Sequence, residues 1–126
     1  MKTVTSIAIS EKQFENQIKD LAKIFGWRYY HTWRSIHSPA GFPDIVMVRP
    51  PRLLFAELKA QDGKLSPEQE SWLDDLKECI KVITVAPISK AQPLTYYDAE
   101  HSGTLIIPEV YLFRPSDFEK IAKVLA

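Results

Sequence analysis

The stretch Gly41–Gln69, GFPDIVMVRPPRLLFAELKAQDGKLSPEQ, contains two apolar segments separated by the pair Pro50-Pro51. The segments DIVMVR (44–49) and LLFAELKA (53–60) are nearly continuous in apolar residues, which is typical of strands that are covered on both faces. Adjacent prolines mark a turn between the two segments. This stretch therefore predicts a β-hairpin.

Three charged residues stand in this hairpin, where a core strand has no structural use for charge. If the strands turn symmetrically about the two prolines, the numbers of paired residues add up to 101, so Asp44 lies opposite Glu57. Directly opposed side chains share one face of the sheet, with Cβ atoms about 4.5–5.5 Å apart. Lys59, two residues after Glu57, shares that face. The other face is apolar and suits packing against a helix; it carries Leu54, Ala56, Leu58 and Ala60.

Two carboxylates at this distance repel each other unless a cation intervenes. A hard divalent ion such as Mg²⁺ or Mn²⁺ takes oxygen ligands of this kind. It lowers the pKa of a bound water and neutralises charge on a phosphoryl oxygen, while Lys59 can orient the water or stabilise the transition state. The pattern therefore indicates metal-assisted hydrolysis of a phosphate ester. On spacing alone, an ion pair of Asp44 and Glu57 with Lys59 that serves only structure remains an open alternative.

The segments before the hairpin predict a helix, a strand and a loop. Ser10 is an N-cap candidate for a helix over 11–25 that ends at Gly26. Its apolar stripe consists of Phe14, Ile18, Leu21 and Phe25. Residues 27–35 are aromatic and β-prone, which favours a strand, and the proline-containing segment 36–43 favours a loop.

After the hairpin, Ser66 as N-cap, Pro67 at the first helical position and Gln69 at the third predict a capping box and a helix over 66–78. Strands are expected at 80–87 and 104–113, the second broken by Pro108, and a helix capped at Ser116 closes the chain. The order of elements predicts an α/β fold with a central mixed sheet flanked by helices. We expect the three tryptophans, Trp27, Trp33 and Trp72, to lie in the core.

Length and composition predict one globular domain over 1–126, with 45% hydrophobic residues. Lys+Arg and Asp+Glu are equal at 16 each, so net charge identifies no partner, although seven Lys/Arg against three acids in residues 23–64 would suit an anionic ligand. The single cysteine excludes an internal disulfide and a thiolate metal cluster. No apolar run is long enough to span a bilayer, so we expect no membrane association and a cytoplasmic protein.

The chain resembles the VRR-NUC family of the PD-(D/E)XK nuclease superfamily. The resemblance rests on an ordered set of motifs: GFPD (41–44), FAELKA (55–60), GKLSPEQ (63–69), Trp72-Leu73, and flanking segments 11–33 and 110–125. It implies a restriction-endonuclease-like core. In the family the middle helix leads through one short strand to the end segment, whereas about thirty residues, Cys79–Pro108, intervene here as an insertion.

The resemblance implies that Asp44, Glu57 and the Leu58 carbonyl bind Mg²⁺, which Mn²⁺ can replace, and that Lys59 is the catalytic lysine. An acidic residue of the first helix completes such sites. Glu11, about 50° from the centre of the apolar stripe, is preferred to Glu15 at about 90°, and it also matches the family's E-x-x-F pattern. Gln69 matches the glutamine that supports the site by hydrogen bonding.

The expected activity is that of a Mg²⁺-dependent DNA endonuclease, and the resemblance points to a structure-specific homodimer that acts on a Holliday junction or other branched DNA, in a phage or mobile-element setting. Candidate contacts to DNA are His31, Arg34, Ser38, Gly41 and Lys64. Two alternatives stay open: a catalytically silent nucleic-acid-binding module of the same fold, and a carboxylate cluster that is only structural.

Overall fold

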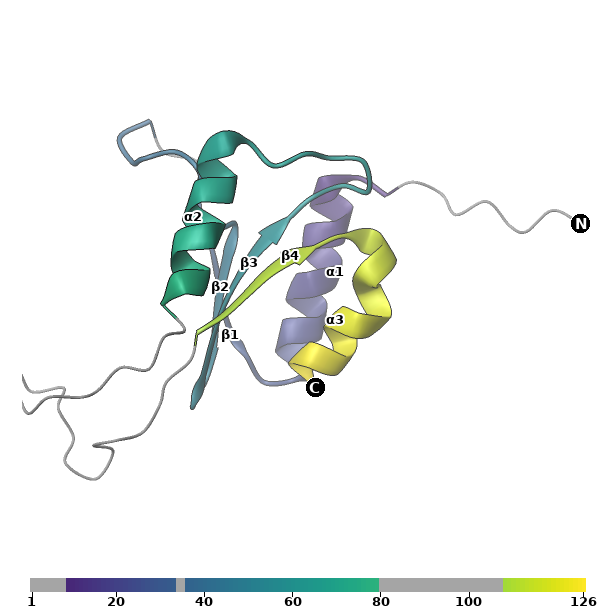
Figure 1. Cartoon of the computed structure of the whole chain (residues 1–126). Helices are drawn as coiled ribbons and strands as arrows, with labels where there is room; N and C mark the ends of the chain where they lie inside the picture. Colours follow the sequence, from purple (N-terminus) through teal and green to yellow (C-terminus); the bar gives the residue numbers. More distant parts are fainter. Residues whose placement is uncertain (1–8, 34–35, 80–107) are drawn as a thin grey trace, which may run out of the picture.

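The computed structural model describes residues 9–33, 36–79 and 108–126 of the chain. In these ranges a sheet of four strands lies between helices (Figure 1). The elements, in chain order, are α1 (Glu11–Ile24), β1 (Arg28–His31), β2 (Ile45–Arg49), β3 (Arg52–Leu58), α2 (Pro67–Glu78), β4 (Glu109–Phe113), a 3₁₀ turn (Pro115–Asp117) and α3 (Phe118–Leu125). None of the helices among the described residues is long and apolar enough to cross a membrane.

The sheet is mixed, as predicted, and its strand order is β1-β2-β3-β4. The β2–β3 hairpin has the expected register, from Ile45 opposite Ala56 to Arg49 opposite Arg52. β1 pairs antiparallel with β2, and β4 pairs parallel with β3. The mixed sheet flanked by helices is the arrangement of a restriction-endonuclease-like core.

The capping box predicted at Ser66 is present, and the predicted N-cap Ser10 forms one as well. Ser10 accepts a hydrogen bond from the Gln13 amide at 3.0 Å and donates its own amide to the Gln13 side chain at 2.9 Å. Ser66 and Gln69 make the same pair of bonds at the start of α2, at 3.1 and 2.8 Å. Because these bonds satisfy amides that have no partner within the helix, they fix where α1 and α2 begin.

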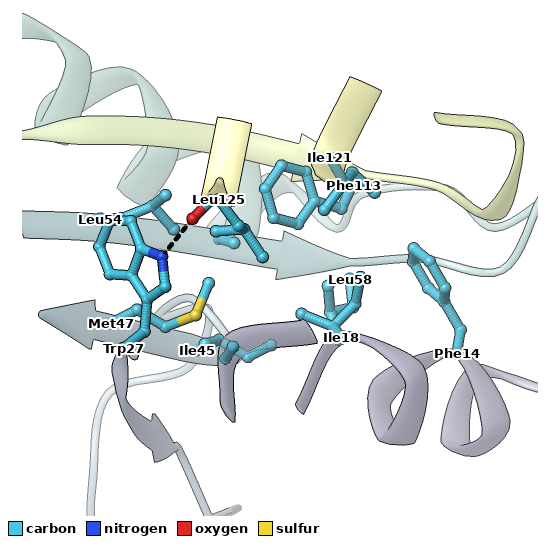
Figure 2. Close-up of a cluster of buried hydrophobic side chains, with 12 residues drawn as sticks. Phe14, Ile18, Trp27, Ile45, Met47, Leu54, Leu58, Phe113, Ile121 and Leu125 are labelled. Atoms are coloured by element: carbon cyan, nitrogen blue, oxygen red, sulfur yellow. Dashed lines mark hydrogen bonds between the residues drawn. The ribbon is translucent and has the colours of Figure 1, made fainter. Parts of the chain in front are cut away.

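The core lies between the sheet and the pair α1 and α3 (Figure 2). Helix α2 covers the opposite face of the sheet (Figure 1). The core side chains, all almost completely buried, include Phe14, Ile18, Ile45, Met47, Leu54, Leu58, Phe113, Ile121 and Leu125. Trp27 closes one end, where its indole nitrogen donates to the Leu125 carbonyl at 2.8 Å. Both faces of the hairpin are therefore covered, which explains its apolar character.

Two expectations from the sequence are wrong, and a third concerns residues outside those that the structure describes. Ser116 does not cap the last helix, because a 3₁₀ turn precedes α3 and the Asp117 carboxylate accepts the Arg114 amide at 3.3 Å. Trp33 is 81% exposed and not part of the core, since β1 already ends at His31. The strand expected at 80–87 and most of the insertion fall outside the described residues.

Candidate functional site

The site is built where β2 begins and β3 ends. Asp44 directly precedes β2, and its backbone amide donates to Glu57 Oε1 at 3.2 Å. The Leu58 amide donates in turn to Asp44 Oδ2 at 2.9 Å. The two carboxylates thus lie side by side at one end of the hairpin, as the register predicts, and each is held by the backbone of the opposite strand.

Among the described residues, Glu57 is the charged residue that is buried, with 1% of its surface exposed. Burial, followed by the negative charge of Asp44, raises the pKa of Glu57 to about 8. A carboxyl in such surroundings keeps its proton at neutral pH unless a positive charge is supplied. A cation bound beside the pair would therefore stabilise the ionised form of both carboxylates.

Two side chains support Glu57 from the same face. The Gln69 amide nitrogen donates to Glu57 Oε2 at 2.8 Å while its oxygen completes the cap of α2. Lys59 Nζ lies 3.8 Å from the same Oε2, and its side chain is 15% exposed. Gln69 thus connects the beginning of α2 to the carboxylate, and Lys59 is the ammonium group nearest to it among the described residues.

A hollow of about 300 Å³ opens on one side of Asp44. It is lined by Glu11, Lys12, Glu15, His31, Asp44 and Leu58. Glu15 forms an ion pair with His31 Nε2 at 2.5 Å and with Lys12 at 3.0 Å. Both acidic candidates of α1 therefore face the hollow that Asp44 and Leu58 also line, with Glu15 held by two basic partners and Glu11 more exposed.

A second, larger hollow of about 860 Å³ also borders Asp44. Lys59, Lys64, Ser38, Gly41 and Gln69 line it, so it contains three of the predicted contacts to DNA. His31 belongs to the smaller hollow, and Arg34 falls outside the described residues. Asp44 lines both hollows and so stands between them.

Gly41 has a structural reason to be glycine. Its φ is +98°, a conformation that side chains disfavour, and a Cβ there would lie 2.5 Å from the carbonyl carbon and oxygen of Glu68. The loop before Asp44 therefore approaches the backbone at the start of α2 as closely as it can. The Trp72 indole adds a hydrogen bond to the Ala40 carbonyl at 3.2 Å.

Sequence reasoning missed two residues that hold the site. Thr32 donates its amide to the Asp44 carbonyl at 2.7 Å and its hydroxyl to the Pro43 carbonyl at 2.8 Å. Arg114 Nη1 donates to the carbonyls of Ala60, Gln61 and Gly63, at 2.9, 3.3 and 2.6 Å, in the turn after Lys59. The role of Thr32 could have been deduced by pairing β1 with β2. The position of Arg114 depends on where β4 joins the sheet, and local sequence pattern does not specify the partner strand of β4.

The oxygen atoms here are those that Mg²⁺ and Mn²⁺ prefer: two carboxylates and the backbone carbonyl of Leu58. Across the described parts of the chain, no three Asp, Glu, His or Cys side chains stand together as a complete metal site. Mg²⁺ commonly binds through one or two carboxylates and keeps waters or substrate oxygens as its remaining ligands. The paired acids and the raised pKa of Glu57 fit such an ion.

Comparison with known proteins gives one match. The model of the VRR-NUC domain family matches residues 9–87, which include the hairpin, α1, α2 and every residue of the paired-carboxylate site. No curated protein and no solved structure matches the chain.

Proposed function

The chain belongs to the VRR-NUC domain family, a family of nuclease domains, and from this membership we propose that it is a metal-dependent DNA endonuclease. The observation that carries the proposal is the pair Asp44 and Glu57, with Lys59 on the same face, at the end of the hairpin. Two acids and a lysine in this arrangement suit phosphodiester hydrolysis better than they suit a structural role, because burial beside Asp44 disfavours ionisation of Glu57 unless a further cation is bound.

In this proposal Asp44, Glu57 and the Leu58 carbonyl would hold Mg²⁺ or Mn²⁺, with Glu11 as the preferred further ligand and Glu15 as the alternative. The bound ion would lower the pKa of a water ligand and offset charge on the phosphoryl group. Lys59 would orient the attacking water or donate to the phosphoryl oxygen as negative charge develops. Gln69 keeps Glu57 in place through its hydrogen bond to Oε2.

DNA would approach over the larger hollow, which Lys59, Lys64 and Ser38 line, and Lys64 and Ser38 would contact phosphates there. Contacts of a backbone phosphate with lysine position the strand and carry no sequence information. We propose branched DNA, with the Holliday junction first, as the substrate, and a homodimer as the active form, because resolving a junction requires two cuts. Membership of the VRR-NUC family is the basis for proposing this substrate and this assembly.

The test is a cleavage assay on linear duplex, nicked, flap and four-way-junction DNA, with Mg²⁺, Mn²⁺ or EDTA. Asp44→Asn, Glu57→Gln and Lys59→Met should each reduce cleavage at least about 100-fold. Asp20→Asn and Lys19→Met, on exposed positions of α1 outside both hollows, are the matched controls and should retain activity. Circular dichroism should show unchanged folds.

Full activity in any of the three site variants would refute the mechanism. Tight DNA binding without cleavage of any substrate would favour the silent binding module instead. Light scattering of the wild-type protein, alone and with junction DNA, tests the homodimer.

A further inference from the structure

The larger hollow combines the proposed catalytic groups with exposed aromatic side chains. Its lining includes Asp44, Lys59 and Gln69 as well as Tyr30 and Trp33. Lys64 lies on the same hollow. A ligand that occupies this hollow can therefore touch the hydrolytic site and an aromatic surface at the same time.

Both aromatic residues are exposed to a degree that core packing does not explain. Trp33 is 81% exposed and Tyr30 is 61% exposed. The contact of Trp33 with the His31 ring is T-shaped, with the ring centroids 6.2 Å apart and the planes at 66°, and it leaves most of the indole exposed. By contrast, Trp27 is buried and Trp72 packs edge-on against Phe42 at 5.1 Å. Trp33 is thus the tryptophan of the described chain that presents an open ring to a ligand.

Aromatic rings beside cations are the combination by which proteins bind single-stranded nucleic acid. Each base has a π-face that can stack on an indole, and lysines neutralise the neighbouring phosphates. In an intact duplex these base faces are already stacked on one another and unavailable, unless the base is moved out of the helix. The Trp33 surface therefore suits a base that has no pairing partner.

We propose that Trp33 stacks on an unpaired base of the DNA strand whose phosphate lies at Asp44 and Lys59. The inference rests on the proposed nuclease function and narrows its substrate class: within branched DNA it favours structures with an unpaired nucleotide next to the scissile phosphate, such as a flap, over a fully paired four-way junction. Tyr30 lines the same hollow, and Lys64 binds a neighbouring phosphate.

The test measures binding without cleavage, by fluorescence anisotropy of a labelled single-stranded oligonucleotide and a duplex of equal length, in EDTA. Trp33→Leu and Trp33→Ala should bind the single strand about 5- to 150-fold more weakly. Trp33→Phe, which keeps an aromatic face, should stay within about threefold of wild type. Duplex affinity should change less than about twofold in all three variants, since stacking needs an unpaired base.

Ile24→Ala is the matched control, because Ile24 is an exposed apolar residue that lines neither hollow. A 2-aminopurine base in the oligonucleotide gives a second readout: its emission should fall on binding to wild type and Trp33→Phe, and not to Trp33→Leu.

The proposal is overturned if Trp33→Ala binds normally, if Leu and Phe variants lose equal affinity, or if duplex binding falls equally. A change of mass in light scattering for Trp33→Ala would also overturn it, because it would place a second copy of the chain on this surface. Cleavage measured in Mg²⁺ distinguishes failure of the two proposals. If the wild type cuts no DNA, the proposed nuclease function fails, but the effect of the Trp33 variants on single-strand binding would still show whether Trp33 stacks on a base.

Discussion

The backbone holds Asp44 and Glu57 side by side: Glu57 Oε1 accepts the Asp44 amide at 3.2 Å, and Asp44 Oδ2 accepts the Leu58 amide at 2.9 Å. Each side chain accepts a backbone amide of the opposite strand, so the two acidic groups stay close together although ionisation of both is disfavoured. The backbone therefore keeps two acidic groups close together, so ionisation of both is unfavourable in the absence of a cation. This has consequences that can be measured.

The stability of the metal-free protein should depend on Glu57. Because the pKa of Glu57 is raised to about 8 in the folded state, from an ordinary value of 4.5, the folded chain binds more protons than the unfolded chain between these values. The free energy of unfolding from this group therefore falls as pH rises from about 4.5 to 8. Glu57→Gln should be more stable than wild type at pH 9 by at least about 1 kcal/mol, and the difference should vanish near pH 4.

Urea denaturation in EDTA at pH 4, 7 and 9 measures this effect, with the exposed Glu119→Gln as control. A stability difference that is equal at every pH would contradict the prediction. Addition of Mg²⁺ should stabilise the wild type at pH 7 more than it stabilises Glu57→Gln.

Gly41→Ala should be much more harmful than Gly26→Ala. Both glycines have positive φ, +98° and +78°, but a Cβ at Gly41 would collide with the Glu68 backbone at 2.5 Å, whereas nothing lies within 4 Å of a Cβ at Gly26. We expect a loss of about 1 kcal/mol for Gly26→Ala from the backbone conformation alone, and a loss of more than about 2 kcal/mol for Gly41→Ala. Chemical denaturation compares them, and equal losses would show that the loop moves away from α2 without cost.

Variants of Gln69 and Ser66 should distinguish the capping of α2 from the support that Gln69 gives to Glu57. Both form the capping box of α2, so Gln69→Ala and Ser66→Ala should each lower stability by about 1 kcal/mol. Only Gln69 also binds Glu57, at 2.8 Å. Gln69→Ala should therefore lose about 10- to 100-fold in cleavage rate, while Ser66→Ala stays near wild type under conditions where both are folded. An equal loss in the two variants would assign the effect to the helix cap.

The pair Arg52 and Glu109 should stabilise the sheet above acidic pH. Arg52 binds both oxygens of Glu109 at 2.7 Å and, with the Tyr111 hydroxyl, holds the pKa of Glu109 below its ordinary value. Its contribution is therefore present above the unfolded pKa near 4.5 and is lost as pH falls through the lower folded-state value. Glu109→Gln should lose about 1 kcal/mol at pH 7 and show a smaller difference at pH 2.5. Thermal unfolding of the wild type and Glu109→Gln at both pH values tests this prediction. A larger stability difference at pH 2.5 than at pH 7 would contradict it.

Local chemistry explains which parts of the fold the sequence could predict. The Ser10 and Ser66 capping boxes and the Pro50-Pro51 turn depend on neighbours in the chain, so their positions followed directly, and the register of the hairpin then placed Asp44 beside Glu57. The parallel pairing of β3 with β4 joins segments about fifty residues apart, and no local pattern specifies such a partner.

The same distinction holds for the site. The face shared by Asp44, Glu57 and Lys59 could be deduced from strand periodicity, whereas the burial of Glu57 depends on how α2 docks through Gln69. Trp33 was expected in the core because tryptophan is usually well buried, and nothing local indicates that β1 ends at His31 and leaves the indole exposed. Arg114 acts on the turn after Lys59 only because β4 brings it there.

The parallel pairing of β3 with β4 also brings the C-terminal segment into the same core as the family-matched part of the chain. The family match stops at residue 87, yet the same core includes Phe113, Ile121 and Leu125. The entropy of closing a connection grows only with the logarithm of its length, so the thirty residues from Cys79 to Pro108 add little to the cost of bringing β4 to the sheet. We therefore expect that β4 and α3 still complete this core when the segment between α2 and β4 is exchanged for another sequence.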